Sequence, residues 1–250
     1  MEARAQPASS AARGARLAAF GASVKGPAHA AAGAPNQDAW ASGRAGNWRV
    51  VAVADGLGSR PLADVGAKAA CAAVVEAVRR WRRNPAAPTE VLLALVHVLW
   101  RARVAPRPPE DCASTCLFAA LGADGAGVAG QLGDGLLLVR DGAGLRPLHQ
   151  RPSGDFANET AALGVTKHMS AWQTATFSPG ARAVVLCTDG IADDLLPDKL
   201  DEFATWALNH RDLAPRARGA ALRAALRSWP TPAHTDDKTL AVLEAHGVTS

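Results

Sequence analysis

The sequence has few of the residues that base stacking, metal–thiolate sites and disulfide frameworks require. No tyrosine occurs among its 250 residues and aromatic residues make up only 5%, so a surface on which nucleic-acid bases stack is not expected. The four cysteines show no Cys-x-x-Cys spacing, which disfavours a zinc site and a disulfide framework. We therefore predict buried, reduced cysteines and a cytoplasmic location. They are Cys71, Cys112, Cys116 and Cys187.

Long apolar segments are also absent. The longest apolar run is VLLALVHVLW at 91–100, which is too short to cross a bilayer. The N-terminal segment lacks the apolar core of a secretory signal, so we expect residues 1–17 to form a flexible tail and 18–250 a single domain. The net charge of +4 comes with arginines clustered in helical stretches, which is typical of solvated helix faces. The sequence thus predicts neither a membrane nor a nucleic-acid partner.

The order of apolar patterns predicts the fold class. Strands are expected near 16–24, 48–54, 114–121, 126–132, 135–140, 183–188 and 239–244, and helices near 62–83, 89–103, 198–209 and 213–228. Asp-Gly turns at 123–125 and 140–142 indicate hairpins. Because strands and helices do not alternate, we predict an α+β fold: an α-β-β-α sandwich of two mostly antiparallel sheets flanked by helix pairs.

Acidic residues stand where several apolar runs end. Two such segments are VVAVADGLGSR (50–60) and AVVLCTDGIADD (183–194), which both stop on Asp-Gly. A single Asp-Gly pair is typical of a turn. Several carboxylates at one sheet edge would repel one another without a cation, and hard oxygen ligands favour magnesium or manganese. Glycine after the aspartate would let the backbone carbonyl approach the ion. The acidic residues concerned are Asp38, Asp55, Asp134, Asp189, Asp236 and Asp237.

The motifs that carry these aspartates resemble one family. NQDAW, VVAVADGLG, ASTCLFAAL, QLGDG, LCTDGI and TDDKTLAVL follow one another in this order. This pattern is similar to that of the metal-dependent protein phosphatases of type 2C (the PPM family) in a compact bacterial form, over residues 18–246. The resemblance implies a β-sandwich flanked by helix pairs, in agreement with the element order.

The resemblance also implies which residues bind metal. Asp55 would bridge two ions, and the Gly56 carbonyl would bind one of them. Asp189 and Asp236 would complete the ligands of the other. The cofactor would be Mn²⁺ or Mg²⁺, with two ions per site and a possible third.

Three further aspartates receive lesser roles from the resemblance. Asp38 would be a catalytic residue that orients metal-bound water. Asp134 would help to hold the third, weaker ion. Asp237 stands where the family often has asparagine, so it ranks below Asp236 as a ligand.

The function implied is that of a serine/threonine protein phosphatase. Water activated between two metals would hydrolyse phosphoserine or phosphothreonine, and the protein, a monomer, would oppose a bacterial protein kinase on a phosphorylated protein substrate. The alternative is a catalytically weak relative that acts as a phosphoprotein-binding regulatory module.

Two departures from the family pattern affect the metals and the leaving group. Gln37 stands where many members have glutamate, and a neutral amide is a poorer metal ligand, so its place as a ligand is doubtful. Leu57 stands where eukaryotic members carry a histidine suited to protonating the leaving group. Bacterial members usually lack that histidine, so water would serve there.

A third departure concerns phosphate docking. The arginine that many members place five residues before Asp38 is replaced by Gly33. We expect another cation to bind the phosphate, with Lys25 and His29 the first candidates and Arg44 and Arg60 the next.

Residues of the less regular segment 150–175 complete the expectations. The family forms a flap near the site there, so His168 and Trp172 are candidates for contact with substrate. His97, inside the apolar helix, is expected to be a packed, hydrogen-bonded residue rather than a ligand.

Overall fold

The fold is a sandwich of two five-stranded sheets. The computed structural model describes residues 16–84, 86–148, 161–229 and 235–246. Every pair of neighbouring strands is antiparallel. The first sheet has the order β1 (Arg16–Val24), β10 (Lys238–His246), β9 (Ala183–Cys187), β6 (Leu136–Asp141) and β7 (Gly144–Pro147). The second has the order β2 (Asp38–Ala45), β3 (Trp48–Asp55), β4 (Cys116–Leu121), β5 (Gly127–Leu132) and β8 (Gln173–Phe177).

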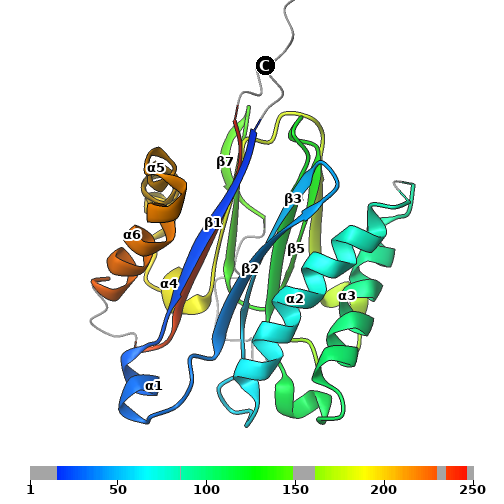
Figure 1. Cartoon of the computed structure of the whole chain (residues 1–250), viewed down its shortest axis with the longest axis vertical. Coiled ribbons are helices and arrows are strands. Elements are labelled where there is room, and N and C mark those ends of the chain that lie inside the picture. Colours follow the sequence, from blue (N-terminus) through cyan, green and yellow to red (C-terminus); the bar gives the residue numbers. More distant parts are fainter. Residues whose placement is uncertain (1–15, 85, 149–160, 230–234, 247–250) are drawn as a thin grey trace, which may run out of the picture.

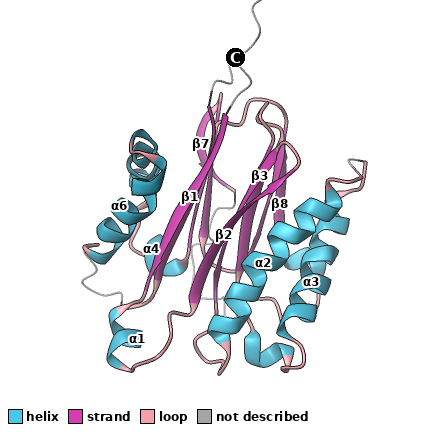
Figure 2. Cartoon of the chain, viewed as in Figure 1, coloured by secondary structure: helices cyan, strands magenta, loops and turns pink. Residues whose placement is uncertain are grey.

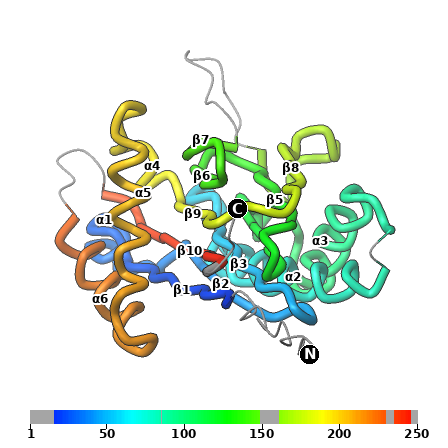
Figure 3. The backbone as a smooth tube through the Cα atoms, turned by 90° about the horizontal axis from the view of Figure 1, so that it is seen from above, coloured from blue at the N-terminus to red at the C-terminus, as the bar shows by residue number. Residues whose placement is uncertain are grey.

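Helix pairs cover both outer faces of the sandwich (Figures 1 and 2). Helices α2 (Ala63–Trp81) and α3 (Thr89–Val104) pack on the second sheet, while α5 (Leu200–Asn209) and α6 (Pro215–Arg227) pack on the first. The view from above shows the two pairs on opposite sides of the strands (Figure 3). The predicted α-β-β-α arrangement is confirmed.

Strand β3 shows why the sheets lie between helices. Val50, Ala52 and Ala54 face α2 and α3, while Val51 and Val53 face the other sheet. Successive side chains of a strand point to opposite faces, so a strand apolar at every position is buried on both. All four cysteines are free and buried, as predicted.

Three strands were not predicted from the sequence: β2, β7 and β8. In addition, residues 16 and 17, assigned to the tail, begin β1, and residues 1–15 lie outside the described part. The β6–β7 hairpin exists, but its positive-φ glycine is Gly144 (φ 119°) and not Gly142.

Two short helices lie at the end of the sandwich where the acidic motifs meet. Helix α1 (Pro27–Ala31) follows β1, and α4 (Asp189–Ala192) follows β9 (Figure 1). Within the described ranges, no helix combines the length and the apolar character needed to cross a membrane.

Candidate metal centre

The β2–β3 ladder places two carboxylates opposite each other. Asp38 is the first residue of β2, Asp55 is the last of β3, and the two are cross-strand partners. Side chains of directly opposed residues start only about 5 Å apart. Asp38 is 5% exposed, so this acidic pair lies largely out of water.

The neighbouring sheet brings the next two carboxylates to the same place. Asp189 directly follows β9 and Thr188, and Asp236 precedes β10. A buried hydrogen bond joins the sheets here, because Thr188 Oγ1 donates to Asp38 Oδ2 at 2.8 Å. The backbone N–H of Thr239 in turn donates to Thr188 Oγ1 at 3.1 Å. Three of the quoted motifs therefore meet at one end of the sandwich.

The pKa values of these carboxyl groups are displaced upward. Burial, followed by the charges of Asp38, Asp189 and Asp236, raises the pKa of Asp55 to about 11. Burial also raises the pKa of Asp38 to about 7, against the opposing effect of the Thr188 hydrogen bond.

Asp189 extends the cluster towards the β5–β6 turn. Burial, then the charges of Asp134 and Asp236, raises its pKa to about 6. Asp134 is therefore within electrostatic reach of Asp189, and the structure brings Asp38, Asp55, Asp134, Asp189 and Asp236 to one end of the sandwich. Without a cation, part of this cluster must hold protons.

Both glycines of the Asp-Gly pairs are required by close backbone contacts. A Cβ at Gly56 would lie 2.3 Å from the carbonyl oxygen of Ala63, and one at Gly190 would overlap the carbonyl oxygen of Asp237. Neither glycine has a positive φ. The chain thus needs glycine here because α2 and the loop before β10 pack against the strand ends.

Hydroxyl groups fix the backbone that carries Asp55. The Asp55 N–H donates to Thr115 Oγ1 at 2.8 Å, and Thr115 N–H returns a bond to the Asp55 carbonyl at 2.8 Å. Ser114 Oγ also donates to that carbonyl, at 3.0 Å. We did not anticipate Ser114, Thr115 or Thr188, although each stands beside an aspartate or in a quoted motif, where donors to buried acceptors are needed.

Asp237 is a buried anchor for the loop that precedes β2. It is 1% exposed and accepts hydrogen bonds from the Gly26 and Gln37 N–H groups, both at 2.6 Å. His29 Nδ1 lies 2.9 Å from Asp237 Oδ2 and 3.9 Å from Asp236 Oδ1. The two oxygens of Asp237 are therefore occupied by protein groups, while His29 lies against the acidic cluster.

Gln37 lies beside the Asp55 turn. Its carbonyl oxygen accepts the Gly56 N–H at 3.1 Å. Its side-chain oxygen lies 3.5 Å from the place of a Cβ at Gly58. The amide is thus close to the Asp55–Gly56 segment, as a residue at the edge of the metal centre must be.

The candidate phosphate-binding cations lie at two different ends of the sandwich. Lys25 is exposed in the loop held by Asp237, and Arg60 is half-buried in the loop after Asp55, where its Nε has no hydrogen-bond partner within the described part of the chain. Arg44 lies six residues along β2 from Asp38, about 20 Å away. Arg44 is therefore placed at the opposite end of the sandwich.

The two loop residues proposed for substrate contact differ in their exposure to solvent. Trp172 is 7% exposed and packs on Phe118, whereas His168 is exposed. Trp172 Nε1 donates to His97 Nε2 at 2.9 Å, which confirms His97 as a packed, hydrogen-bonded residue.

The donor set fits hard divalent cations. It contains carboxylate oxygens and a backbone carbonyl at Gly56, without cysteine, and burial followed by the neighbouring carboxylates raises the pKa values of Asp55 and Asp189. Magnesium and manganese prefer such oxygen ligands. Asp55, Asp189, Asp236 and Gly56 would hold such ions.

Comparison with known proteins places the fold. No curated protein matches the chain. Solved structures that resemble it include a bacterial serine phosphatase, with a TM-score of 0.66, 14% identity, and 94% of this chain and 100% of that chain covered. The photosystem II phosphatase PBCP has a TM-score of 0.63 at 16% identity, with 93% and 100% covered. The structure of RsbX in complex with magnesium has a TM-score of 0.54 at 14% identity, with 92% of this chain and 95% of that chain covered.

The family assignment rests on the sequence itself. The family model for protein phosphatase 2C matches residues 25–229, which include Asp38, Asp55, Asp134 and Asp189. Asp236 lies just beyond the match, on the segment that leads into β10. The chain belongs to the protein phosphatase 2C family.

Proposed function

We propose that this protein hydrolyses phosphoserine or phosphothreonine in a protein substrate and so opposes a protein kinase. The observation that carries the proposal is the pair formed by the buried Asp38 and the half-buried Asp55 at a strand end, within electrostatic reach of Asp189 and Asp236. Such a concentration of carboxylates is unfavourable unless cations bind to it. The family match and the serine phosphatases among its structural neighbours support the reaction class.

Each residue has a distinct part in this proposal. Asp55 would bridge two Mn²⁺ or Mg²⁺ ions, the Gly56 carbonyl would bind one, Asp189 and Asp236 would bind the other, and Asp134 would serve a third, weaker site. Two bound ions supply an activated water and neutralise charge on the phosphoryl oxygens.

Asp38 is held for a positioning task. Its Oδ2 accepts the Thr188 hydroxyl, and its carboxyl group also lies within hydrogen-bonding reach of the Asp55 side chain. Asp38, fixed in this way beside Asp55, would orient the attacking water.

Phosphate docking falls to cations at the same end of the sandwich. Lys25 and Arg60 are the two candidates whose positions suit the task, and His29 can assist from beside Asp236. Replacing Lys25 or Arg60 by alanine should raise KM for a phosphopeptide more than it lowers kcat, because such a contact binds substrate and transition state alike. Unchanged kinetics in both variants would exclude them from the site.

The second candidate function is a phosphoprotein-binding module with little turnover. Gln37 and Gly33 favour it, since the first weakens a ligand position and the second removes a phosphate-binding arginine. Gly33 has a φ of 66°, which an arginine would adopt only with strain.

Metal-dependent stability separates the two functions. An ion that binds only the folded chain stabilises it by about 2.7 kcal/mol at a hundred times its Kd. The melting temperature of the wild type should therefore rise with manganese, and that of Asp189→Asn should change little. Asp198→Asn, at an exposed position outside the cluster, is the matched control and should respond as the wild type does. Equal melting of the wild type in manganese and in chelator would exclude the hydrolase.

A further inference from the structure

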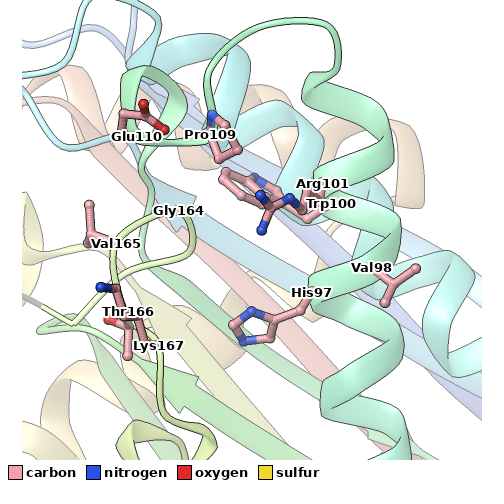
Figure 4. Close-up of a pocket in the computed structure, with 10 residues that line it drawn as sticks. All are labelled: His97, Val98, Trp100, Arg101, Pro109, Glu110, Gly164, Val165, Thr166 and Lys167. Carbon is pink, nitrogen blue, oxygen red and sulfur yellow. The ribbon is translucent and has the colours of Figure 1, made fainter.

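A cavity lies outside the metal centre. It has a volume of about 520 Å³ and is bounded by α3, by the 3₁₀ helix Pro109–Cys112 and by residues 164–167 (Figure 4). Trp100, Val98 and Val165 give it apolar walls. The polar side chains that line it belong to His97, Arg101, Glu110, Thr166 and Lys167.

His97 presents a hydrogen-bond donor to this cavity. Because Trp172 Nε1 donates to His97 Nε2 at 2.9 Å, Nε2 must carry a lone pair. Burial lowers the pKa of His97, so the ring is neutral and its proton lies on Nδ1. No residue in the described part of the chain hydrogen-bonds to Nδ1, and the ring points into the cavity (Figure 4).

Two cations on the rim add positive charge. Arg101 on α3 and Lys167 on the opposite wall have no carboxylate within 4.0 Å among the described residues. Glu110 lies at the other end of the cavity from His97 and Lys167 (Figure 4). The cavity therefore combines an N–H donor and one cation on each of two opposite walls with apolar surface from Val98, Val165 and the edge of Trp100, which is 2% exposed.

A short path of hydrogen bonds connects the cavity to the metal centre. Leu163, next to Gly164 in the cavity wall, exchanges two backbone bonds with Ser114, of 2.8 and 3.2 Å. Ser114 Oγ donates to the Asp55 carbonyl at 3.0 Å, and Ser114 also forms a β-bridge with Gly56. One residue, Ser114, thus joins the cavity wall at 163–164 to the backbone of Asp55 and Gly56.

We propose that this cavity binds a small organic anion with an apolar body and that its occupancy alters metal binding at Asp55. Arg101, Lys167 and His97 Nδ1 bind the anionic group, and Trp100 contacts the apolar body. The proposal has two halves: the binding of the anion, and the effect of its binding on the metal centre. The second, regulatory half rests on the proposed function, whereas the first, binding half does not.

The binding half is tested with benzenesulfonate as the probe. In chelator, ¹⁵N-detected indole signals should shift for Trp100 and Trp172 and stay in place for the other tryptophans, with Trp→Phe variants supplying the assignment. The neutral analogue benzenesulfonamide and the bare anion sulfate should each bind at least about tenfold more weakly, because each lacks one half of the recognition.

Charge variants provide matched controls. Arg101→Gln and Lys167→Gln should each weaken benzenesulfonate binding about fivefold or more, as expected for a partly desolvated charged hydrogen bond. Arg83→Gln removes the same charge from an exposed position away from the cavity and should leave binding unchanged. If Arg83→Gln weakens binding as much as Arg101→Gln, or if Trp100 does not respond, no such site exists.

The regulatory half is tested by manganese affinity. Saturating benzenesulfonate should change the manganese Kd, measured by calorimetry, about threefold or more, and manganese should change the probe's Kd by the same factor. Arg101→Gln should abolish this coupling. An unchanged manganese Kd would overturn the regulation and leave the phosphatase standing, whereas absence of manganese binding would overturn the proposed phosphatase and leave the anion site standing.

Discussion

The β2–β3 ladder carries a pair of like charges at each of its ends. Asp38 lies opposite Asp55 at one end, and Arg44 lies opposite Arg49 near the other. Like charges directly opposed on neighbouring strands destabilise a sheet. The ladder therefore compares an acidic and a basic pair in the same backbone geometry.

Burial makes the two pairs different. Asp38 is buried, and the pKa of Asp55 is raised by burial and then by Asp38. Arg44 is exposed and Arg49 half-buried, and burial followed by Arg44 lowers the pKa of Arg49. Water can solvate two arginines on the surface, whereas the aspartates are deprived of it. A pair of like charges is therefore costly where solvent is excluded and tolerated where it is not.

The largest difference is expected in catalysis. Asp55→Asn should lower hydrolysis of a phosphothreonine peptide in manganese buffer by at least about a hundredfold, a barrier increase of about 2.7 kcal/mol, because the bridging ligand is lost. Arg49→Gln alters the other end of the same strand and should keep wild-type activity. The assay compares kcat/KM of the two variants.

Activity in Asp55→Asn above about a tenth of wild type, a loss below about 1.4 kcal/mol, would contradict the assignment of Asp55 as the bridging residue. Loss of activity in Arg49→Gln as well would show that the two ends of the ladder are not independent. Circular dichroism of both variants must match the wild type for either conclusion.

The next effect concerns stability in the absence of metal. A carboxyl whose pKa is higher in the folded than in the unfolded chain stabilises the fold fully below the unfolded pKa, about 3.9. This contribution is lost as pH rises through the folded pKa. With folded pKa values of about 6 for Asp189, about 7 for Asp38 and about 11 for Asp55, the free energy of unfolding in chelator should fall most steeply between about pH 4 and pH 8 and continue to fall, more gently, towards about pH 11.

Asp38→Asn should make this fall shallower by at least about 1.4 kcal/mol, the value of one pKa unit, when urea unfolding is followed across that range. Saturating manganese should flatten the wild-type profile, since bound cations replace the protons. A profile in chelator that is the same for the wild type and Asp38→Asn would show that Asp38 does not retain a proton in the fold.

Much of the fold could be predicted from apolar patterns, and the exceptions have a physical reason. Strand β2 reads DAWASGRA, with small and polar residues of low strand propensity. It is a strand because β3 pairs with it and α2 covers it, and Gly43 permits this cover, since a Cβ there would overlap the Val75 side chain. Such tertiary contacts leave no periodic signal in one sequence.

Only part of the candidate site could be predicted from the sequence, because local patterns mark strand ends but not tertiary contacts. Aspartates at the ends of apolar runs mark Asp55 and Asp189, because a strand end fixes their position. Asp237 follows the same pattern as Asp236, yet it accepts bonds from Gly26 and Gln37. Partners that lie 211 and 200 residues away in the sequence cannot be inferred from local spacing.

A smaller effect should follow from adding charge to the buried end. Gln37→Glu places a carboxylate beside the Asp55–Gly56 segment and should lower the manganese concentration for half-maximal rate by a few-fold, because a charged oxygen binds a hard cation better than an amide does. The matched variant Asn47→Asp adds a carboxylate in the exposed turn between β2 and β3, at the other end of the ladder from Asp38, and should leave this concentration unchanged. A constant or higher value in Gln37→Glu would place residue 37 outside the metal ligands.

The smallest effect is expected at the exposed end. Arg44→Glu converts the pair with Arg49 from repulsive to attractive and should raise the free energy of unfolding by about 0.2–1 kcal/mol. Arg44→Gln removes only the repulsion and should give a smaller increase. Urea unfolding in low salt measures both, and the gain should shrink in about 0.5 M salt because exposed charges are screened. Equal stability of all three proteins in low salt would mean that water already cancels the repulsion between Arg44 and Arg49.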